Sequence, residues 1–497
     1  MIRIHNLGFP RIGAGRELKK ALEAYWRGDI DATALKDCGR QLRQRHWKIQ
    51  AEAGLDLIPV GDFSLYDQVL DMSALLGAVP PRFNWHDKQV DLDTLFRMAR
   101  GRAPSGQSAA ACEMTKWFDS NYHYIVPEFY AGQGFSLADS KLFDEIEEAQ
   151  ALGHTVKPVI LGPLSWLWLG KVREGKFDKL ALLEQLLPVY AEILHRLKQQ
   201  GVEWVQIDEP ILVLDLPPEW RQALKSVYHR LQGSGLKILL ASYFGALGEN
   251  TRLACQLPVD GLHIDAVRAP QQLSDVLNWL PACKILSLGI IDGRNIWRTN
   301  LDAALQYLDE ARRHLDDRLW LAPSCSLLHV PVDLQQETKL DPELKSWLAF
   351  ACQKITELAT LKQALIAGHD AVSQELKNTR AAICSRHESP LTCRDDVRAR
   401  LKLIDEPMTQ RHSPYPQRAQ KQREWLKLPL YPTTTIGSFP QTDEIRRHRR
   451  ARRKGEISEE EYIEQMQAQI AAVIEKQQQL GLDVLVHGEP ERNDMVE

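Results

Sequence analysis

Residues 431–497 read YPTTTIGSFPQTDEIRRHRRARRKGEISEEEYIEQMQAQIAAVIEKQQQLGLDVLVHGEPERNDMVE and repeat the order of motifs at the start of the chain. Gly28-Asp29-Ile30 returns as Gly455-Glu456-Ile457, Gly54-Leu55-Asp56 as Gly481-Leu482-Asp483, and Gly61-Asp62 as Gly488-Glu489. All three pairs are 427 residues apart, and Gly8-Phe9-Pro10 is echoed by Ser438-Phe439-Pro440 at an offset of 430. A fixed offset over several short matches indicates an internal duplication.

The first copy alternates short apolar strands with amphipathic helices up to about residue 350. This alternation predicts a parallel sheet, and about eight such units fit a (β/α)8 TIM barrel better than an open sheet. There are more strand candidates than barrel positions, so one of them must be wrong or lie outside the barrel. The candidates are Ile2–His5, Asp56–Val60, Tyr122–Val126, Val156–Leu161, Trp204–Ile207, Ile238–Ser242, Gly261–Ile264, Ile285–Ile290 and Trp320–Ala322.

The rest of the chain predicts three domains. Residues 1–350 form the barrel, residues 351–427 a helical connector with a proline-rich linker, and residues 428–497 the start of a second, incomplete barrel. A barrel needs roughly 250 residues, which the second copy lacks. We expect such a fragment to be disordered, docked on another chain, or prone to aggregation. Within the first barrel, Pro188 should kink or divide the helix predicted over Lys179 to Gln199.

Composition excludes several classes of protein. A net charge of −4 argues against bulk affinity for nucleic acid. The eight cysteines contain no Cys-x-x-Cys pair, which is typical of a reducing compartment. The longest apolar run, Val159 to Gly170, contains Pro163 and is too short to span a bilayer. We therefore expect a cytoplasmic monomer that binds neither nucleic acid nor membrane and has no secretory signal at its start.

Polar residues follow the predicted strands, at the ends that meet on one face of a parallel barrel, where sites are built. They include Asp62, Glu128, Asp208, Glu209, His263, Asp265, Asp292 and Cys325. Any single one could instead cap a helix or close a turn. An independent barrel enzyme that works through Asp208, Glu209, His263 and Asp292 is therefore one reading of this face.

Two basic clusters could bind anions. Arg16, Lys19 and Lys20 lie on one face of the first helix, and Lys116 stands beside aromatic residues in Glu113-Met114-Thr115-Lys116-Trp117-Phe118. Together they would suit a polyanionic ligand with an aromatic ring, although the first cluster alone is also typical of a solvated helix face. Arg446 to Lys454 holds seven basic residues in nine positions, and we favour a solvated helix face over nucleic-acid binding there.

Metal and nucleotide motifs are missing from the sequence. It contains no His-Glu-x-x-His, no His-x-Cys, no P-loop and no Gly-x-Gly-x-x-Gly after a strand. Cys325, His263 and Glu209 could meet at a barrel mouth, but a buried, inert cysteine is the simpler interpretation.

Motifs spread over the whole chain resemble those of the cobalamin-independent methionine synthase family, whose members consist of two barrels that arose by duplication. The motifs are Gly8–Gly13, Arg16–Lys20, Glu113–Phe118, Gln206–Pro210, Thr435–Pro440 and His487–Glu497. The resemblance implies transfer of the N5-methyl group of 5-methyltetrahydropteroyltri-L-glutamate to L-homocysteine, which gives L-methionine. It implies folate contacts at Arg16, Glu17, Leu18, Lys19 and Lys116, and homocysteine contacts at Ile436, Gly437, Ser438 and Glu489.

The resemblance also implies a zinc ion, and no cobalamin. The zinc ligands and the catalytic proton donor of the family would fall beyond Glu497, so we expect no metal ligand and no catalytic residue within this chain. On this interpretation the sequence is an N-terminal piece of the enzyme and is inactive by itself. The alternative is a non-catalytic folate-binding fragment or pseudo-enzyme.

Overall fold

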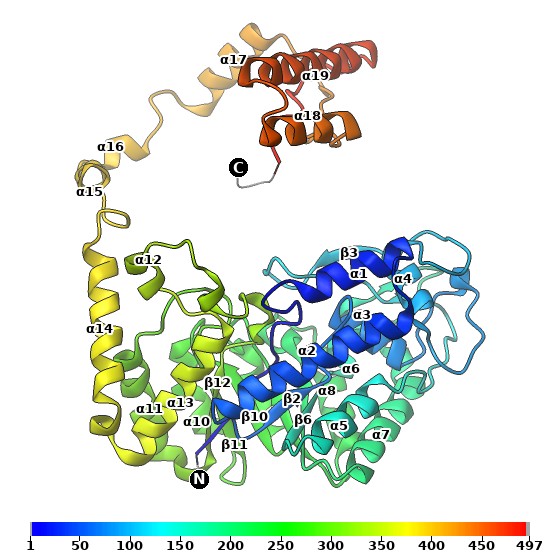
Figure 1. Cartoon of the computed structure of the whole chain (residues 1–497), viewed down its shortest axis with the longest axis vertical. Coiled ribbons are helices and arrows are strands. Elements are labelled where there is room, and N and C mark those ends of the chain that lie inside the picture. Colours follow the sequence, from blue (N-terminus) through cyan, green and yellow to red (C-terminus); the bar gives the residue numbers. More distant parts are fainter. Residues whose placement is uncertain (1, 494–497) are drawn as a thin grey trace. The chain divides into compact units, whose positions relative to one another are not determined.

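The computed structural model describes residues 2–493 and divides into two compact units between Cys393 and Arg394. Figure 1 shows the first unit from blue to yellow and the second from orange to red. None of the described helices is both long and apolar enough to cross a membrane.

The first unit is built on an eight-stranded parallel barrel, as predicted. The sheet order is β1-β12-β11-β10-β9-β8-β6-β2. A parallel bridge between His5 and Leu57, with the Asp56 amide donating to the Ile4 carbonyl at 2.9 Å, joins β2 to β1 and closes the sheet. The barrel strands are β1 (Arg3–Ile4), β2 (Ile58–Val60), β6 (Val156–Leu161), β8 (Trp204–Asp208), β9 (Lys237–Ala241), β10 (Gly261–Asp265), β11 (Ile285–Ile291) and β12 (Leu319–Pro323).

Of the nine strand candidates, Tyr122–Val126 is the one that lies outside the barrel. Its strand β4 (His123–Ile125) pairs antiparallel with β3 (Met114–Lys116) in a hairpin outside the barrel. Tyr124 and Ile125 are buried, so the segment carries the apolar side chains of a barrel strand without being one. Glu128 likewise lies outside the barrel, in β5 (Glu128–Phe129) paired with β7 (Lys171–Val172), and forms ion pairs with Arg82 and Arg173.

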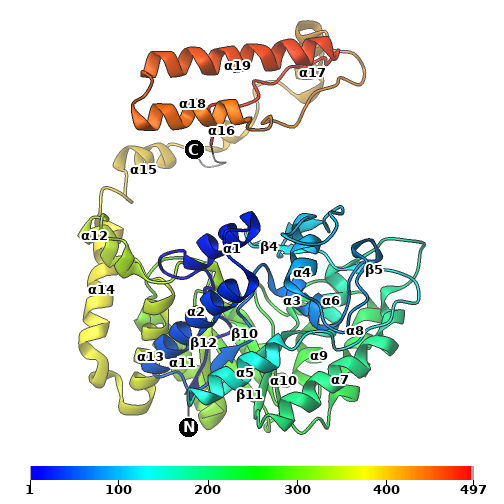
Figure 2. The same cartoon turned by 45° about the vertical axis from the view of Figure 1, so that its right-hand side comes forward.

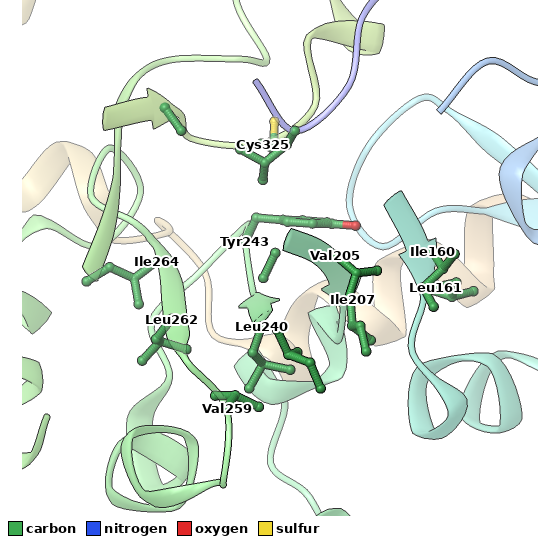
Figure 3. Packing of buried hydrophobic residues seen from close by; sticks show 14 of the residues in the cluster. Ile160, Leu161, Val205, Ile207, Leu240, Tyr243, Val259, Leu262, Ile264 and Cys325 are labelled. Carbon is green, nitrogen blue, oxygen red and sulfur yellow. The ribbon is translucent and has the colours of Figure 1, made fainter. Parts of the chain in front are cut away.

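Alternating side chains give the barrel two different surfaces. Val205, Ile207, Leu240, Leu262 and Ile264 belong to the main apolar cluster, which also includes the surrounding helices (Figure 3). The intervening residues face the interior, because successive side chains of a strand point to opposite faces. At the amino end of the strands the interior is filled by Leu57, Trp204, Leu239 and Trp320, a separate apolar layer.

Helices surround this barrel (Figures 1 and 2). They are α1 (Glu17–Arg27), α2 (Ala32–Glu52), α3 (Gln68–Leu75), α4 (Leu92–Arg100), α5 (Lys141–Ala151), α6 (Pro163–Leu169), α7 (Leu183–Gln199), α8 (Pro218–Leu231), α9 (Thr251–Gln256), α10 (Leu273–Trp279), α11 (Leu301–Leu315), α12 (Pro342–Ser346), α13 (Ala351–Ala367) and α14 (Ser373–Glu388).

Two helical segments differ from expectation. Helix α7 is not divided at Pro188; the break falls earlier, where a short 3-10 turn (Lys179–Leu182) ends. Helices α13 and α14, expected in the connector, lie in the first compact unit. The reason is burial, since Ile355, Leu358 and Leu361 of α13 join the apolar core of the barrel.

The second unit contains α15 (Asp395–Lys402), α16 (Glu406–Thr409), α17 (Tyr415–Leu426), α18 (Asp443–Lys454) and α19 (Glu459–Gln479). The first and last residues of α19 are those of α2 shifted by 427 positions, and the last residue of α18 is that of α1 shifted by the same number. The paired glycines also agree: φ is 82° at Gly28 and 71° at Gly455, 87° at Gly54 and 74° at Gly481. The local structure thus repeats together with the sequence.

Candidate functional site

The carboxyl ends of the barrel strands hold buried, internally paired carboxylates. Glu209 is fully buried and accepts hydrogen bonds from the Ser165 amide at 2.7 Å, the Leu164 amide at 3.2 Å and the Tyr228 hydroxyl at 3.2 Å. Burial raises the pKa of Glu209 to about 7, and these donors oppose the rise. Asp208 accepts from Gln206 Nε2 at 2.7 Å and from the Tyr243 hydroxyl at 3.0 Å.

A polar network fills the middle of the barrel, and sequence reasoning missed most of it. Ser287 Oγ lies 2.7 Å from His5 Nε2 and 2.8 Å from His263 Nδ1. Lys157 is fully buried and donates to Gln206, and burial lowers its pKa. A lysine inside an otherwise apolar strand was the available signal, because a buried charge requires partners.

Asp62 and Asp208 do not line a cavity that could hold a substrate. The cavity beside them is about 50 Å³, which holds water but nothing larger. Asp292 accepts from Asn295 Nδ2 at 2.5 Å and from the Arg294 amide at 2.8 Å, so it closes a turn. Because these carboxylates are engaged within the fold, the geometry does not favour an independent enzyme that works through them.

The cationic run that opens α1 is only partly exposed. Arg16 precedes the helix with φ of 58° and points into solvent, as does Lys19, which lies 3.9 Å from Glu23. Leu18 is 0% exposed and packs in an apolar cluster. The Glu17 carboxylate accepts from the Gly15 amide at 2.9 Å and pairs with Arg45 at 2.6 Å. Arg16, Lys19 and Lys20 are exposed, so all three cations of this run are available to a ligand.

Lys116 projects from the β3–β4 hairpin. It is exposed, whereas its neighbour Trp117 is 1% exposed, because alternate residues of a strand face opposite sides. The hairpin and α1 lie at the same end of the barrel in both views (Figures 1 and 2). A cavity of about 350 Å³ lies beside the hairpin turn, lined by Asp119, Ser120, Asn121, Tyr122, Arg294, Leu328 and His329.

The second unit brings two distant motifs together. The Phe439 amide donates to the Gly488 carbonyl at 2.9 Å, so Ser438 and Glu489 each adjoin the same contact. Ile436 and Ser438 are exposed. Glu489 has φ of 55°, and its carboxylate pairs with Arg492. The end of this motif, residues 494–497, lies outside the described residues.

Side chains that could bind a metal ion do not cluster in the described part of the chain. Within residues 2–493 there is no group of three or more His, Cys, Asp or Glu side chains that could hold one. Cys325 is buried, and burial raises the pKa of its thiol well above the ordinary value. The zinc implied by the sequence resemblance does not fit the described residues.

Comparison with known proteins decides the family. The model described as "Cobalamin-independent synthase, N-terminal domain" matches residues 3–316, and "Cobalamin-independent synthase, Catalytic domain" matches residues 431–497. The chain belongs to the cobalamin-independent methionine synthase family. The resemblance read from the motifs and the barrel fold are thereby both confirmed.

Relatives within this family match over the whole chain. A "5-methyltetrahydropteroyltriglutamate--homocysteine methyltransferase" of Coxiella burnetii (strain Dugway 5J108-111) is 56% identical over 497 residues. A protein of the same name from Acidithiobacillus ferrooxidans is 53% identical over 525 residues. The chain spans 64% and 66% of the length of these two curated relatives.

A solved structure supports the fold alone. The B12-independent methionine synthase from Shewanella sp. W3-18-1 aligns with a TM-score of 0.50 at 15% identity, over 70% of this chain and 91% of that one.

Proposed function

We propose that the chain takes part in transfer of the N5-methyl group of 5-methyltetrahydropteroyltri-L-glutamate to L-homocysteine, in methionine biosynthesis. The observation that carries this proposal is 56% identity, along the whole chain, to a relative named for that reaction. Free thiols are expected in the cytoplasm, where we place the protein, and no disulfide joins its cysteines in the described residues.

In this proposal the first unit binds the folate. The exposed cations Arg16, Lys19 and Lys116 belong to α1, its first flanking residue and the β3–β4 hairpin, and these elements lie at one end of the barrel (Figures 1 and 2). The three cations would pair with the carboxylates of the glutamate tail. Glu17 and Leu18 would contribute their backbone or hold the helix, because the carboxylate of Glu17 is paired and Leu18 is buried.

The second unit would bind the amino acid. Backbone N–H groups of Ile436 to Ser438 and the Ser438 hydroxyl would donate to the homocysteine carboxylate. Glu489 would accept from its ammonium group, exchanging its contact with Arg492. The hydrogen bond between Phe439 and Gly488 supports this pairing of the two motifs.

Binding measurements test the folate site. Lys116→Gln and Lys19→Gln should each weaken binding of triglutamyl 5-methyltetrahydrofolate about tenfold, because each removes one cation that would pair with a carboxylate of the tail. Each should weaken binding of the monoglutamyl form much less. Lys237→Gln is the matched control, since Lys237 is an exposed lysine at the amino end of β9. Equal losses in all three variants would contradict the assignment.

We further propose that the chain by itself does not turn over. The support is that none of the described donor sets fits the metal that would activate the homocysteine thiol. The test is a methyl-transfer assay with zinc, triglutamyl folate and homocysteine. Formation of methionine in proportion to protein concentration would overturn this part of the proposal.

A further inference from the structure

The hairpin that carries Lys116 is attached to the barrel unit through its side chains, since Trp117, Tyr124 and Ile125 are buried. In the described residues its strands pair with each other and with no further strand, Met114 with Ile125 and Lys116 with His123. A short two-stranded hairpin is marginal in water, so the surrounding structure must hold it. The base has an anchor: the Ile125 amide donates to the buried carboxylate of Asp67 at 3.0 Å.

The turn is held by a second acid, Asp119. Its carboxylate lies 2.7 Å from Arg294 Nη1 and 3.0 Å from Arg268 Nη2, and its carbonyl accepts from Arg294 Nη2 at 3.2 Å. Arg268 follows β10 and Arg294 follows β11, two neighbouring strands of the barrel. One side chain thus ties the tip of the hairpin to two barrel loops.

The backbone beneath this contact is strained and packed with aromatic rings. Phe118 has φ of 51° and Phe244 φ of 80°, both unusual for bulky residues. Their ring centroids are 5.9 Å apart, and Arg294 lies 4.8 Å from the Phe244 ring. Such strain persists only where the surroundings fix the conformation. The turn is therefore held at a fixed position relative to the barrel loops that contact it.

We propose that Asp119 is a positioning residue: through Arg268 and Arg294 it fixes the hairpin so that the Lys116 ammonium meets the glutamate tail of the folate. This inference rests on the proposed folate site. Asp119 also offsets the charge of the two arginines, so that they compete less with Lys116 for the carboxylates of the tail. The loops that follow β10 and β11 thereby support a binding element.

Hydrogen exchange in the 497-residue chain tests the positioning directly. The Trp117 amide, which donates to the Tyr122 carbonyl at 2.7 Å, reports on the turn, and the Ile125 amide reports on the base. Asp119→Asn should lower protection of the Trp117 amide about five- to tenfold and leave Ile125 unchanged. Asp302→Asn is the control, because it breaks a comparable ion pair with Arg380 elsewhere on the unit. Unchanged protection at Trp117 would overturn the proposal.

Folate binding tests the consequence. Asp119→Asn should raise the Kd of the triglutamyl folate three- to tenfold and that of the monoglutamyl form by less. In a Lys116→Gln background it should add little, because the two residues act through one contact. Additive losses, or equal losses for both folates, would overturn the positioning role. Failure of the unmodified chain to bind either folate would instead overturn the proposed function. In that case hydrogen exchange would still show whether Asp119 holds the turn in place.

Discussion

Glu209 shows how a carboxylate at a strand end can serve the fold instead of catalysis. It follows β8, where barrel enzymes place catalytic groups, yet its side chain is fully buried and surrounded by donors from α6 and α8. Burial nevertheless outweighs these donors and raises its pKa to about 7. The competition between desolvation and hydrogen bonding makes Glu209 a titrating group in the folded state.

Stability should therefore depend on pH through Glu209. Between its ordinary pKa of 4.5 and the folded value of about 7, the folded state holds a proton that the unfolded state has lost. Stability then falls as pH rises through this window. Glu209→Gln should reduce that fall by about 1 kcal/mol per pH unit, measured as the unfolding free energy of the first unit in urea at pH 5, 6 and 7.

The control is Glu249→Gln, because Glu249 has an exposed side chain paired only with Arg221 in the described residues. It should leave the pH dependence as it is in the unmodified chain. If Glu209→Gln also left it unchanged, the hydrogen-bond donors to Glu209 would be keeping the carboxylate ionised.

Individual residues of the candidate site were only partly predictable. A run such as Arg16 to Lys19 indicates an anion site as a group, but successive helical residues point about 100° apart, so Leu18 enters the core while Lys19 stays in solvent. The ion pairs of Asp119 could not be predicted at all. They join residues 149 and 175 positions apart in the sequence, and only the folded barrel brings them together.

At the scale of elements, the turns and helix caps that occur in both copies were predictable from the sequence. Gly61 and Gly488 both adopt positive φ, 86° and 89°, and both stand one residue before an acid. Helix α2 begins after Asp31 and α19 after Ser458, and each of these side chains caps its helix. Caps and turns depend on a few adjacent residues, so the sequence carries them directly. The partner of a strand depends on the whole fold, which is why the sequence did not show that Tyr122–Val126 was the candidate outside the barrel.

The glycines that recur in the two copies differ in the space around them. A Cβ at Gly61 would lie 2.6 Å from Leu142 Cδ1 and 3.1 Å from the Val159 carbonyl oxygen, whereas a Cβ at Gly28 would meet nothing within 4 Å. Gly28→Ala should thus cost only backbone strain, about 1 kcal/mol. Gly61→Ala should cost about 3 kcal/mol, because it adds overpacking to a similar strain. Urea unfolding of the two variants measures this difference, and equal losses would mean that β2 and α5 move apart without penalty.

At the scale of the whole molecule, the part of the second unit that precedes α18 is highly exposed. In residues 394–412 and 421–430 every side chain is exposed, and Trp425 retains 81% of its accessible surface. Lys427 lies just past α17 with φ of 50°, at a helix end without buried contacts.

Limited proteolysis should consequently separate the barrel unit from α18 and α19. Trypsin should cut first within the exposed stretches 394–412 and 421–430, because a protease needs about ten residues of chain that can leave their native conformation. Mass spectrometry should then find a fragment that ends within one of these stretches and resists further cleavage. If the fold assignment is right, that fragment keeps the thermal transition of the barrel, and if the folate site is right, it keeps affinity for the triglutamyl folate. First cleavage within residues 101–111, the loop after α4, would contradict this prediction, because it would show that this loop leaves its native conformation more readily than residues 394–412 and 421–430 do.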